Sequence, residues 1–313
     1  MQIRPLRNLD EAAREHAALH NACHPEDPVL PEDLRGWLES LEESTIVVAE
    51  ENGEVVGGAW AAIHHGRPLA EARVLVFPAH RRSGIGSALY EALSEWERQR
   101  GGTELDARVQ ETQSQSLAFA TNRGFVEIGR EQGLELDLTT IETPTVEAPT
   151  GVEIVTWAQQ PDLIRGIYEV ACEAYPDVPG EEETRMPSFE NWLKEDMTGA
   201  GDRPEATFVA VAGKEVVGYA KFSLTDAQPT RAYHDMTGVR RSWRGRGVAR
   251  ALKAAEIRWA KQQGYERLRT QNEERNTPIR RLNERFGYRP VPGRVLLRGP
   301  LAGRLKGGIH RSP

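Results

Sequence analysis

Cysteine is nearly absent from this chain of 313 residues, in which only Cys23 and Cys172 occur. Two cysteines are too few for a disulfide framework, and their scarcity indicates a reducing compartment. The sequence also has no run of 18 apolar residues, and residues 1–5 lack the apolar core of a signal peptide. We therefore predict a cytoplasmic protein that is not attached to a membrane.

An excess of positive charge is also missing, because 40 Lys and Arg residues stand against 47 Asp and Glu residues, for a net charge of −7. This balance argues against a nucleic-acid partner and is usual for an enzyme in solution. The length allows about two ordinary domains, each able to bury its own core. We leave open whether the protein is a monomer or a homodimer.

Metal-ligand motifs are scarce as well. His16, His20 and His24 recur every four residues beside Cys23, which is the spacing of one helical face. Two such histidines can hold a metal ion, but no carboxylate signature accompanies these three. We interpret the stripe as a solvated or partner-facing edge of a helix, and we predict no metal site.

A short loop pattern occurs twice in the sequence. Residues 81–86 read Arg-Arg-Ser-Gly-Ile-Gly, and residues 244–249 read Arg-Gly-Arg-Gly-Val-Ala. Each copy follows a strand-like run and precedes an amphipathic helix. The sequence Glu-Val-Val-Gly also occurs twice, at 54–57 and at 215–218, at the same place in the order of elements. We infer that the chain is a fused duplication.

The two halves are expected to be separate modules. A stretch rich in Thr, Pro and Gly, residues 141–151, has no helical or strand periodicity and is typical of a linker. It predicts an N-terminal module at 1–140 and a C-terminal module at 152–313.

The predicted secondary structure follows the same order in both modules. In the first module we expect strands at 1–6, 45–50, 54–63 and 70–76, and helices at 9–22, 34–41, 84–100 and 116–123. In the second we expect strands at 152–157, 207–212, 215–223 and 233–239, and helices after residue 247 and at 277–286. The pair Asn52-Gly53 marks the turn of the first hairpin.

The repeated loop has the features of a phosphate-binding site. Gly84 and Gly86 have no Cβ, so their N–H groups can approach a ligand and their φ can be positive. They stand where a helix begins, and its free N–H groups and dipole favour an anion. The arginines of the two copies can add bidentate contacts to phosphate.

The loop differs from two common nucleotide-binding motifs. A dinucleotide fingerprint needs a third glycine where Leu89 and Leu252 stand, and a P-loop needs a Lys-Ser or Lys-Thr ending that both copies lack. A plain glycine-rich turn before a helix would account for one copy on its own. Two copies in the same context argue against such a turn.

The pattern Val76-x-Pro78-x-x-Arg81-x-x-Gly84-x-Gly86 resembles the acyl-CoA signature of the GNAT superfamily of N-acetyltransferases, and Val239-x-x-x-x-Arg244-x-x-Gly247-x-Ala249 is similar to it. The resemblance implies an α/β (α+β) chain of two GNAT-like modules, each a mixed, mostly antiparallel, splayed sheet flanked by helices. It also implies acetyl-CoA as the co-substrate. The residues that it places at CoA are Val76, Arg81, Arg82, Ser83, Gly84, Ile85 and Gly86 in the first module, and Thr237, Val239, Arg244, Gly245, Arg246, Gly247, Val248, Ala249, Asn276 and Asn283 in the second.

The strand before the second loop carries the candidate catalytic residues. Strand alternation predicts that Tyr233, Asp235, Thr237 and Val239 share one face. Relatives of GNAT type often carry a base on this strand, so we expect Asp235, directly or through a water, to accept the proton of an amine. In the first module Ala70 and Ala72 occupy that face, which makes the second module the better candidate for catalysis.

The tyrosine that often serves as the acid in GNAT-like enzymes is missing from both modules. Asn283 and Ala120 stand at its two positions. We therefore expect either Tyr233 or a water to protonate the leaving thiolate.

Each of these assignments has a structural alternative. Asp235 can pair with a nearby arginine, Tyr233 can pack in the strand, and Asn276 can cap the helix that follows it. His234 is expected to be a structural histidine, and Trp60, Phe189 and Trp192 are expected to pack in the core. The acidic segment 176–184 is either a lid that attracts a cationic amine or a solvated loop.

Two functions are compatible with the sequence. The first is an acetyl-CoA-dependent N-acetyltransferase that acts on the primary amine of a small molecule, such as an amino sugar, an antibiotic or another natural product. The second is a non-catalytic acyl-CoA-binding sensor or scaffold. Tyr233 and Asp235 favour the enzyme, whereas the missing tyrosine acid favours the binding protein.

Overall fold

The computed structural model describes residues 1–180 and 183–303, and within them twelve strands form one continuous sheet. The elements of the N-terminal half are β1 (Gln2–Pro5), α1 (Leu9–Cys23), α2 (Pro31–Ser40), β2 (Glu43–Glu51), β3 (Glu54–Ile63), β4 (Glu71–Val76), α3 (Ile85–Gln99), β5 (Glu104–Gln110), α4 (Ser114–Thr121) and β6 (Val126–Asp137). Those of the C-terminal half are β7 (Val152–Thr156), α5 (Ile164–Ala174), α6 (Phe189–Trp192), β8 (Asp202–Ala212), β9 (Glu215–Ser223), β10 (Arg231–Val239), α7 (Val248–Gln262), β11 (Arg267–Glu273), α8 (Thr277–Arg285) and β12 (Arg289–Pro300).

The strands follow the order β1-β2-β3-β4-β5-β12-β6-β11-β10-β9-β8-β7. In the described sheet, β4 pairs with β5 and β10 with β11 in parallel, and the other neighbours are antiparallel. From either edge inward, five strands of one half follow in chain order, and the last strand of the other half comes sixth. The predicted fold class and the internal duplication are therefore confirmed.

The two predicted hairpins are present. β3 and β9 have the bounds that alternation predicts, 54–63 and 215–223. At the turn between β2 and β3, φ is 53° at Asn52 and 82° at Gly53. Positive φ at both central residues is what a tight hairpin turn requires, and Asn-Gly is the pair that adopts it at least cost.

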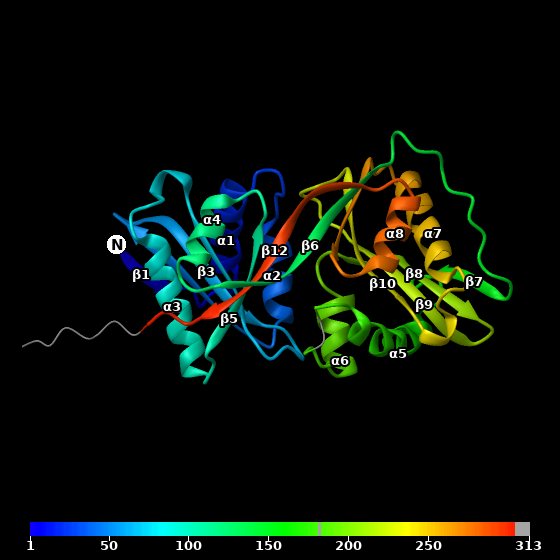
Figure 1. Cartoon of the computed structure of the whole chain (residues 1–313), viewed down its shortest axis with the longest axis horizontal. Coiled ribbons are helices and arrows are strands. Elements are labelled where there is room, and N and C mark those ends of the chain that lie inside the picture. The colour runs from blue at the N-terminus through cyan, green and yellow to red at the C-terminus, as the bar shows by residue number, and fades with distance from the viewer. Residues whose placement is uncertain (181–182, 304–313) are drawn as a thin grey trace, which may run out of the picture.

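Each half of the chain contributes its last strand to the other half. β6 pairs with β11 from Glu131↔Glu273 to Asp137↔Arg267, and β12 pairs with β5 from Arg294↔Gln110 to Pro300↔Glu104. β6 and β12 also pair with each other. In Figure 1 the red β12 runs into the N-terminal half and the green β6 into the C-terminal half. The boundary at residues 141–151 thus divides the sequence but not the sheet.

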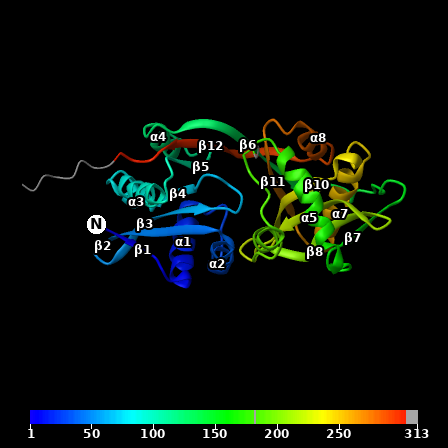
Figure 2. The ribbon, with the colours of Figure 1, turned by 90° about the horizontal axis from the view of Figure 1, so that it is seen from below.

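Helices cover both faces of the sheet in each half. In the N-terminal half, a Cβ built at Gly57 would meet Ile85 of α3, and one built at Gly58 would meet Leu19 of α1. The sheet therefore lies between α1 and α3, as Figure 2 shows. α5 and α7 flank the other half in the same way, since Gly238 faces Val170 and Gly218 faces Leu252. No helix of the described residues is both long and apolar enough to cross a membrane.

The parallel strand pairs separate after a short contact. β10 pairs with β11 only over residues 231–233, and β4 pairs with β5 only at Glu71↔Asp106. Beyond these points the strands diverge, so backbone groups of β10 and β4 on that side have no strand partner. Each half thus has the splayed sheet that the GNAT resemblance implies.

The histidine stripe on α1 is buried, so the interpretation as a solvated or partner-facing edge is wrong. His16, His20 and His24 expose 4%, 7% and 6% of their surface. The three histidines lie on the face of α1 that packs against β3 and β4, where Trp60 donates a hydrogen bond to His16 Nε2 over 3.0 Å. Burial, helped by Arg73, lowers the pKa of His16 to about 3 and of His24 to about 4, so both are neutral at pH 7.

Candidate functional site

The two glycine-rich loops have nearly the same backbone. At the glycine before the helix, φ and ψ are 90° and −11° for Gly84, and 92° and 1° for Gly247. Two residues earlier, φ is 67° at Arg82 and 74° at Gly245. Both loops therefore present the same curve of N–H groups at the N-terminus of a helix of 15 residues.

The space beside these glycines is open. A Cβ built on Gly84 or Gly245 would meet nothing within 4 Å, and one built on Gly247 would meet only Pro149, at 3.8 Å. Ile85 and Val248 are each 1% exposed, and their side chains pack in the hydrophobic cores of the two halves. An open arc of N–H groups at a helix N-terminus fits the diphosphate of CoA.

The arginines of the loops also hold the loops in shape. Arg81 Nε donates to the Val76 carbonyl over 3.1 Å, and Arg244 Nε donates to the Val239 carbonyl over 3.0 Å. Arg246 lies over the ring of Trp243, with its guanidinium 5.1 Å from the ring centroid. Ser83 does not face the cavity, because its hydroxyl donates to the His80 carbonyl over 2.6 Å.

A cavity of about 980 Å³ extends from the second loop into the space between the two halves. Thr237, Val239, Arg244, Gly245 and Gly247 line one part of it. The N-terminal half contributes Arg67, Leu69, Glu71, Asp106, Ala107, Arg108, Ile128 and Glu131. Because strand exchange brings β6 next to β11, both halves of the chain form the wall of this C-terminal cavity.

The prediction that Tyr233, Asp235, Thr237 and Val239 share one face is wrong, because a bulge interrupts β10. His234 lies opposite Phe222 and Met236 opposite Lys221, so Asp235 is the extra residue. A bulge places two consecutive side chains against one partner and reverses the alternation that follows. Asp235 and Met236 therefore face α5, whereas Thr237 and Val239 lie on the α7 side.

Asp235 lines the cavity beside a buried lysine. Its carboxylate lies 2.6 Å from Lys221 Nζ, and Asp202 binds the same ammonium group at 2.6 Å. Asp235 is 40% exposed, whereas Lys221 is 3% exposed. Burial opposes the charge of Lys221, but the carboxylates of Asp235, Asp202 and Asp196 together raise its pKa. Asp235 thus has an ionic partner, but it is Lys221 and not an arginine.

Asp196 is a further member of this cluster. It lies on the short helical segment Leu193–Met197, and it forms a hydrogen bond with Tyr175. Burial, and to a lesser degree Asp235 and Glu195, raise its pKa to about 7, although Lys221 acts in the opposite direction. Sequence reasoning missed both Asp196 and Lys221, since neither belongs to a local motif.

Tyr233 is poorly placed to be the acid. It does not line the cavity that contains Asp235. Burial is the main cause that raises its pKa, and Glu131 and Asp235 add to the shift. A general acid works best when its pKa lies near the working pH, so both its position and its raised pKa argue against Tyr233 as the acid.

Asn276 and Asn283 have different surroundings. Asn276 lines the cavity and stands at the N-cap position of α8, as the alternative held, but its side chain makes no capping hydrogen bond. Asn283 is 0% exposed, and its amide donates to Asn272 Oδ1 over 2.7 Å. The expectation that Asn283 contacts CoA is wrong, because it lies beneath Asn272, which does line the cavity.

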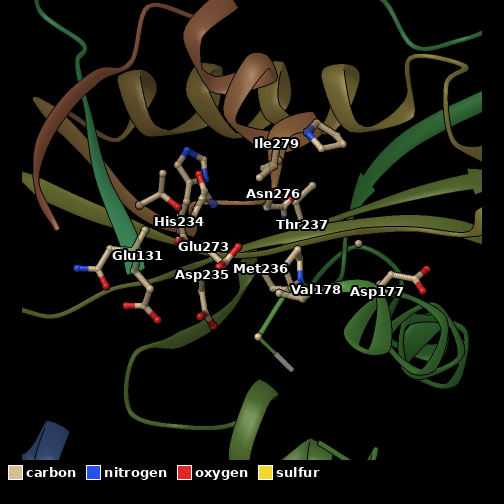
Figure 3. A pocket seen from close by; sticks show the side chains of 18 of the residues that line it. Glu131, Asp177, Val178, His234, Asp235, Met236, Thr237, Glu273, Asn276 and Ile279 are labelled. Carbon is tan, nitrogen blue, oxygen red and sulfur yellow. Dashed lines mark hydrogen bonds between the residues drawn. The ribbon is translucent and has the colours of Figure 1, made fainter. Parts of the chain in front are cut away.

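Three carboxylates lie around the same part of the cavity, as Figure 3 shows for Glu131, Asp235 and Glu273. Glu131 of β6 and Glu273 of β11 are register partners across the exchanged strand. Glu273 accepts hydrogen bonds from the backbone and side chain of Arg275, at 2.6 and 2.8 Å. No pattern near position 131 reveals that β6 contributes to the second module's cavity, so sequence reasoning missed Glu131.

His234 is buried, as expected, and it belongs to a buried polar cluster, but it also lines the C-terminal cavity. It is 2% exposed, and its Nδ1 lies 3.2 Å from Glu256 Oε1. Lys253 and Tyr288 complete the cluster on the α7 side of β10. Burial lowers the pKa of His234 to about 4 against the effect of Glu256, so the imidazole is neutral at pH 7.

The acidic segment 176–184 rests on the second loop where it is described. Asp177 accepts hydrogen bonds from Arg241, at 2.8 and 2.9 Å, and from Arg244, at 2.6 Å. These contacts lower the pKa of Asp177 to about 2. Residues 178–180 line the cavity, and residues 181–182 lie outside the described residues.

The first loop opens on a cavity of its own, of about 450 Å³. Val76, Arg81, Arg82, Gly84 and Gly86 line it, as the sequence predicts for a second CoA cleft. The wall opposite the loop is formed by β5, by α4 and by one residue of the exchanged β12. We refer to it as the N-terminal cavity.

Comparison with known proteins agrees with this geometry. Residues 9–125 and 164–288 each match the model of the acetyltransferase (GNAT) family. The chain belongs to the GNAT acetyltransferase family. This GNAT protein has the tandem arrangement of the tandem GNAT protein from the clavulanic acid biosynthesis pathway, with a TM-score of 0.79, 23% identity, and coverage of 96% of this chain and 99% of the other. A likeness at this level of identity shows the fold.

Curated relatives of the GNAT protein are acyltransferases by name. It is 25% identical over 293 residues to the mycothiol acetyltransferase of Nocardia farcinica (strain IFM 10152), which covers 90% of this chain and 91% of that one. It is 32% identical over 156 residues to the L-amino acid N-acyltransferase MnaT of Escherichia coli (strain K12), over 44% of this chain and 91% of the relative. An aminoglycoside N(6')-acetyltransferase type 1 of Klebsiella aerogenes is 30% identical over 142 residues, over 41% of this chain and 91% of the relative.

Proposed function

We propose that this protein is an acetyl-CoA-dependent N-acetyltransferase that acts on the primary amine of a small molecule in the C-terminal cavity. The observation that carries the proposal is a continuous cavity that joins the loop at Gly245 and Gly247 to the carboxylate of Asp235. When bound, acetyl-CoA supplies an activated acyl group, so that transfer forms a C–N bond and breaks a C–S bond. The amine must lose its proton, and the leaving sulfur must gain one.

Asp235 is the residue that we assign to the amine proton. It lies on the bulge of β10, it is partly exposed to the cavity, and Lys221 fixes its orientation. The strand backbone beyond the bulge has no partner on the β11 side, so its N–H groups are available to a carbonyl oxygen. Water protonates the sulfur in this proposal, because Tyr233 does not line the cavity.

The acceptor is proposed to be cationic before it reacts. Asp235, Glu131 and Glu273 together favour an ammonium group at the place where the two halves meet. The names of the relatives support this class, since they act on amino acids or on an aminoglycoside. An amino sugar, an antibiotic or another small natural product with a primary amine is therefore the proposed acceptor.

Steady-state kinetics of Asp235→Asn test the assignment of the base. We expect kcat/KM for the amine to fall by about 10²-fold or more, while the affinity for CoA measured by calorimetry stays within about threefold. Asp10→Asn is the matched control, because Asp10 is an exposed acid on α1 that pairs only with Arg35 among the described residues. If kcat/KM falls less than about threefold in Asp235→Asn, then Asp235 is not the base.

The same substitution in both loops tests which cavity is catalytic. Gly247→Asp and Gly84→Asp each place a carboxylate in the anion site, at positions where a Cβ has open space. The positive φ of 92° and 90° strains both variants to a similar degree, so the comparison between them is matched. We expect turnover to fall at least about tenfold further in Gly247→Asp than in Gly84→Asp, because the new carboxylate at the second loop repels the diphosphate of CoA. The opposite order would move the chemistry to the N-terminal cavity.

A non-catalytic acyl-CoA-binding protein is the second candidate. The observation that favours it is the absence of a tyrosine among the residues that line the C-terminal cavity within the described chain. It predicts that CoA raises the melting temperature while no amine in a broad panel releases free thiol from acetyl-CoA. If any amine releases free thiol from acetyl-CoA, and this release is lost in Gly247→Asp, the protein is an enzyme.

A further inference from the structure

The N-terminal cavity is lined by positive charge without any acid. Its lining includes Arg73, Arg81, Arg82, Arg108, Arg123 and Arg294, and no Asp or Glu of the described residues lines it. The C-terminal cavity differs, because Glu71, Asp106, Glu131, Asp177, Asp235 and Glu273 all line it. The two cavities share a loop geometry but differ in charge.

Among the described residues, five of these six arginines have no acidic partner. Arg108 pairs with Glu71, and Arg123 stacks on Phe119 at 3.5 Å. In the part of the chain that the structure describes, no carboxylate lies within 4.0 Å of Arg73 or Arg294. The Nε atom of Arg294 is buried and has no hydrogen-bond partner. Arg73 and Arg294 are both half-buried. A guanidinium group that is partly removed from water without an anion is costly, and this indicates a ligand.

The groups around Arg73 do not neutralise it. Its nearest polar contact is His20 Nδ1, at 3.3 Å, and the neighbouring His16 and His24 are neutral at pH 7. The carboxylate of Asp27 acts on Arg73 from a distance, but it is bound to Arg231 over 2.9 Å. Burial and then the charge of Arg294 lower the pKa of Arg73 to about 10, which leaves it protonated at pH 7.

Arg73 occupies the place that corresponds to Met236, the residue next to the bulged Asp235, in the other half. Arg73 lies opposite Trp60 on β3, just as Met236 lies opposite Lys221 on β9 beside the bulged Asp235. Both positions are on the face that is covered by the first long helix of the half. At this level of the cleft, one half thus places a carboxylate and the other a guanidinium group.

We propose that the N-terminal cavity binds an acyl-CoA whose acyl chain ends in a carboxylate. The loop at Gly84 and Gly86 holds the diphosphate, and Arg73 with Arg294 holds the carboxylate at the far end of the same cavity. Arg73 comes from β4 and Arg294 from the exchanged β12, so the site needs both halves of the chain. We assign it a binding role, since no Asp or Glu of the described residues lines it.

Calorimetry on the full-length Gly247→Asp protein tests this proposal, because the variant confines CoA thioesters to the N-terminal cavity. The probes are succinyl-CoA and butyryl-CoA, which differ mainly in the terminal carboxylate. We expect succinyl-CoA to bind at least about tenfold more tightly, as charge-assisted hydrogen bonds imply. In Arg73→Met and in Arg294→Met the difference between the two thioesters falls below about threefold, whereas Arg73→Lys keeps part of it.

Three results would overturn the proposal. One is equal affinity for the two thioesters in the parent protein. Another is a preference for succinyl-CoA that persists in both Arg73→Met and Arg294→Met, with circular dichroism showing that at least one of them is folded. The third is free succinate binding as tightly as succinyl-CoA, since the carboxylate would then not belong to an acyl chain. Turnover in the C-terminal cavity is measured separately, so the proposed function can fail or stand independently of this result.

Discussion

At the scale of single residues, the first loop uses an arginine where the second uses a glycine. Arg82 has φ of 67° and corresponds to Gly245, with φ of 74°. Left-handed backbone is strained for a residue with a Cβ, by about 1–2 kcal/mol. The strain is retained because the backbone curve of the loop requires it and because the guanidinium group lines the N-terminal cavity.

Reciprocal substitutions at these two positions are expected to change stability in opposite directions. Arg82→Gly should raise the free energy of unfolding by about 0.5–1 kcal/mol, and Gly245→Arg should lower it by about 1–2 kcal/mol. A Cβ at Gly245 has open space, so the loss reports backbone strain and not a clash. Urea denaturation measures both changes. Shifts of the same sign in the two variants would show that the loops are not equivalent.

Asp196 makes the stability depend on pH in a direction unusual for an acid. Its folded pKa is about 7, above the usual 3.8, so the folded state keeps a proton that the unfolded chain has lost between about pH 4 and pH 7. The free energy of unfolding should therefore fall as the pH rises through this range. In Asp196→Asn this contribution is absent.

Melting temperatures from about pH 5 to about pH 8 test this expectation. The variant Asp196→Asn should gain stability relative to the parent protein as the pH rises. Asp10→Asn, at an exposed acid, serves as the control. Parallel curves for Asp196→Asn and the parent would show that Asp196 is ionised throughout.

At the scale of elements, the exchanged strands hold the two halves together. β6 and β12 lie side by side at the centre of the sheet, and each pairs with a strand of the other half. The linker at 141–151 contains no helix or strand, so covalent connection there contributes little to the fold. The association of the halves depends on backbone hydrogen bonds and on the buried Leu134, Leu136, Val295 and Leu297.

Cutting the linker should therefore leave the protein assembled. With a protease site in place of residues 143–148, the two fragments should elute together in size-exclusion chromatography and separate only in denaturant. Several of these residues are exposed, so the site is accessible. Fragments that separate in native buffer would contradict the role of the strand exchange.

At the scale of the whole molecule, the two cavities differ in charge, and this predicts different responses to salt. CoA binding in Gly247→Asp reports the N-terminal cavity, and binding in Gly84→Asp reports the C-terminal cavity. Between about 50 and about 300 mM NaCl the affinity should fall more steeply in the first variant, because its cavity is lined by arginines without acids. Equal slopes in calorimetry would show that the lining charge does not govern binding.

The sequence by itself determined the local structure and the duplication. The hairpin at Asn52-Gly53, the two loops and the helices after Gly84 and Gly247 depend on dihedral preferences and spacings within a few residues. Repetition of these local signals also showed that the chain has two GNAT-like halves. Such features depend on neighbouring residues, so they can be predicted from a single sequence.

Only the tertiary structure decided which residues meet at the sites. The exchange of β6 and β12 brings Glu131 to the C-terminal cavity and Arg294 to the N-terminal one. The bulge at Asp235 changes the face of Thr237, and packing of α1 on the sheet buries the histidines that we expected in solvent. Each of these outcomes depends on pairing between residues far apart in the chain, whose energies a local pattern does not contain.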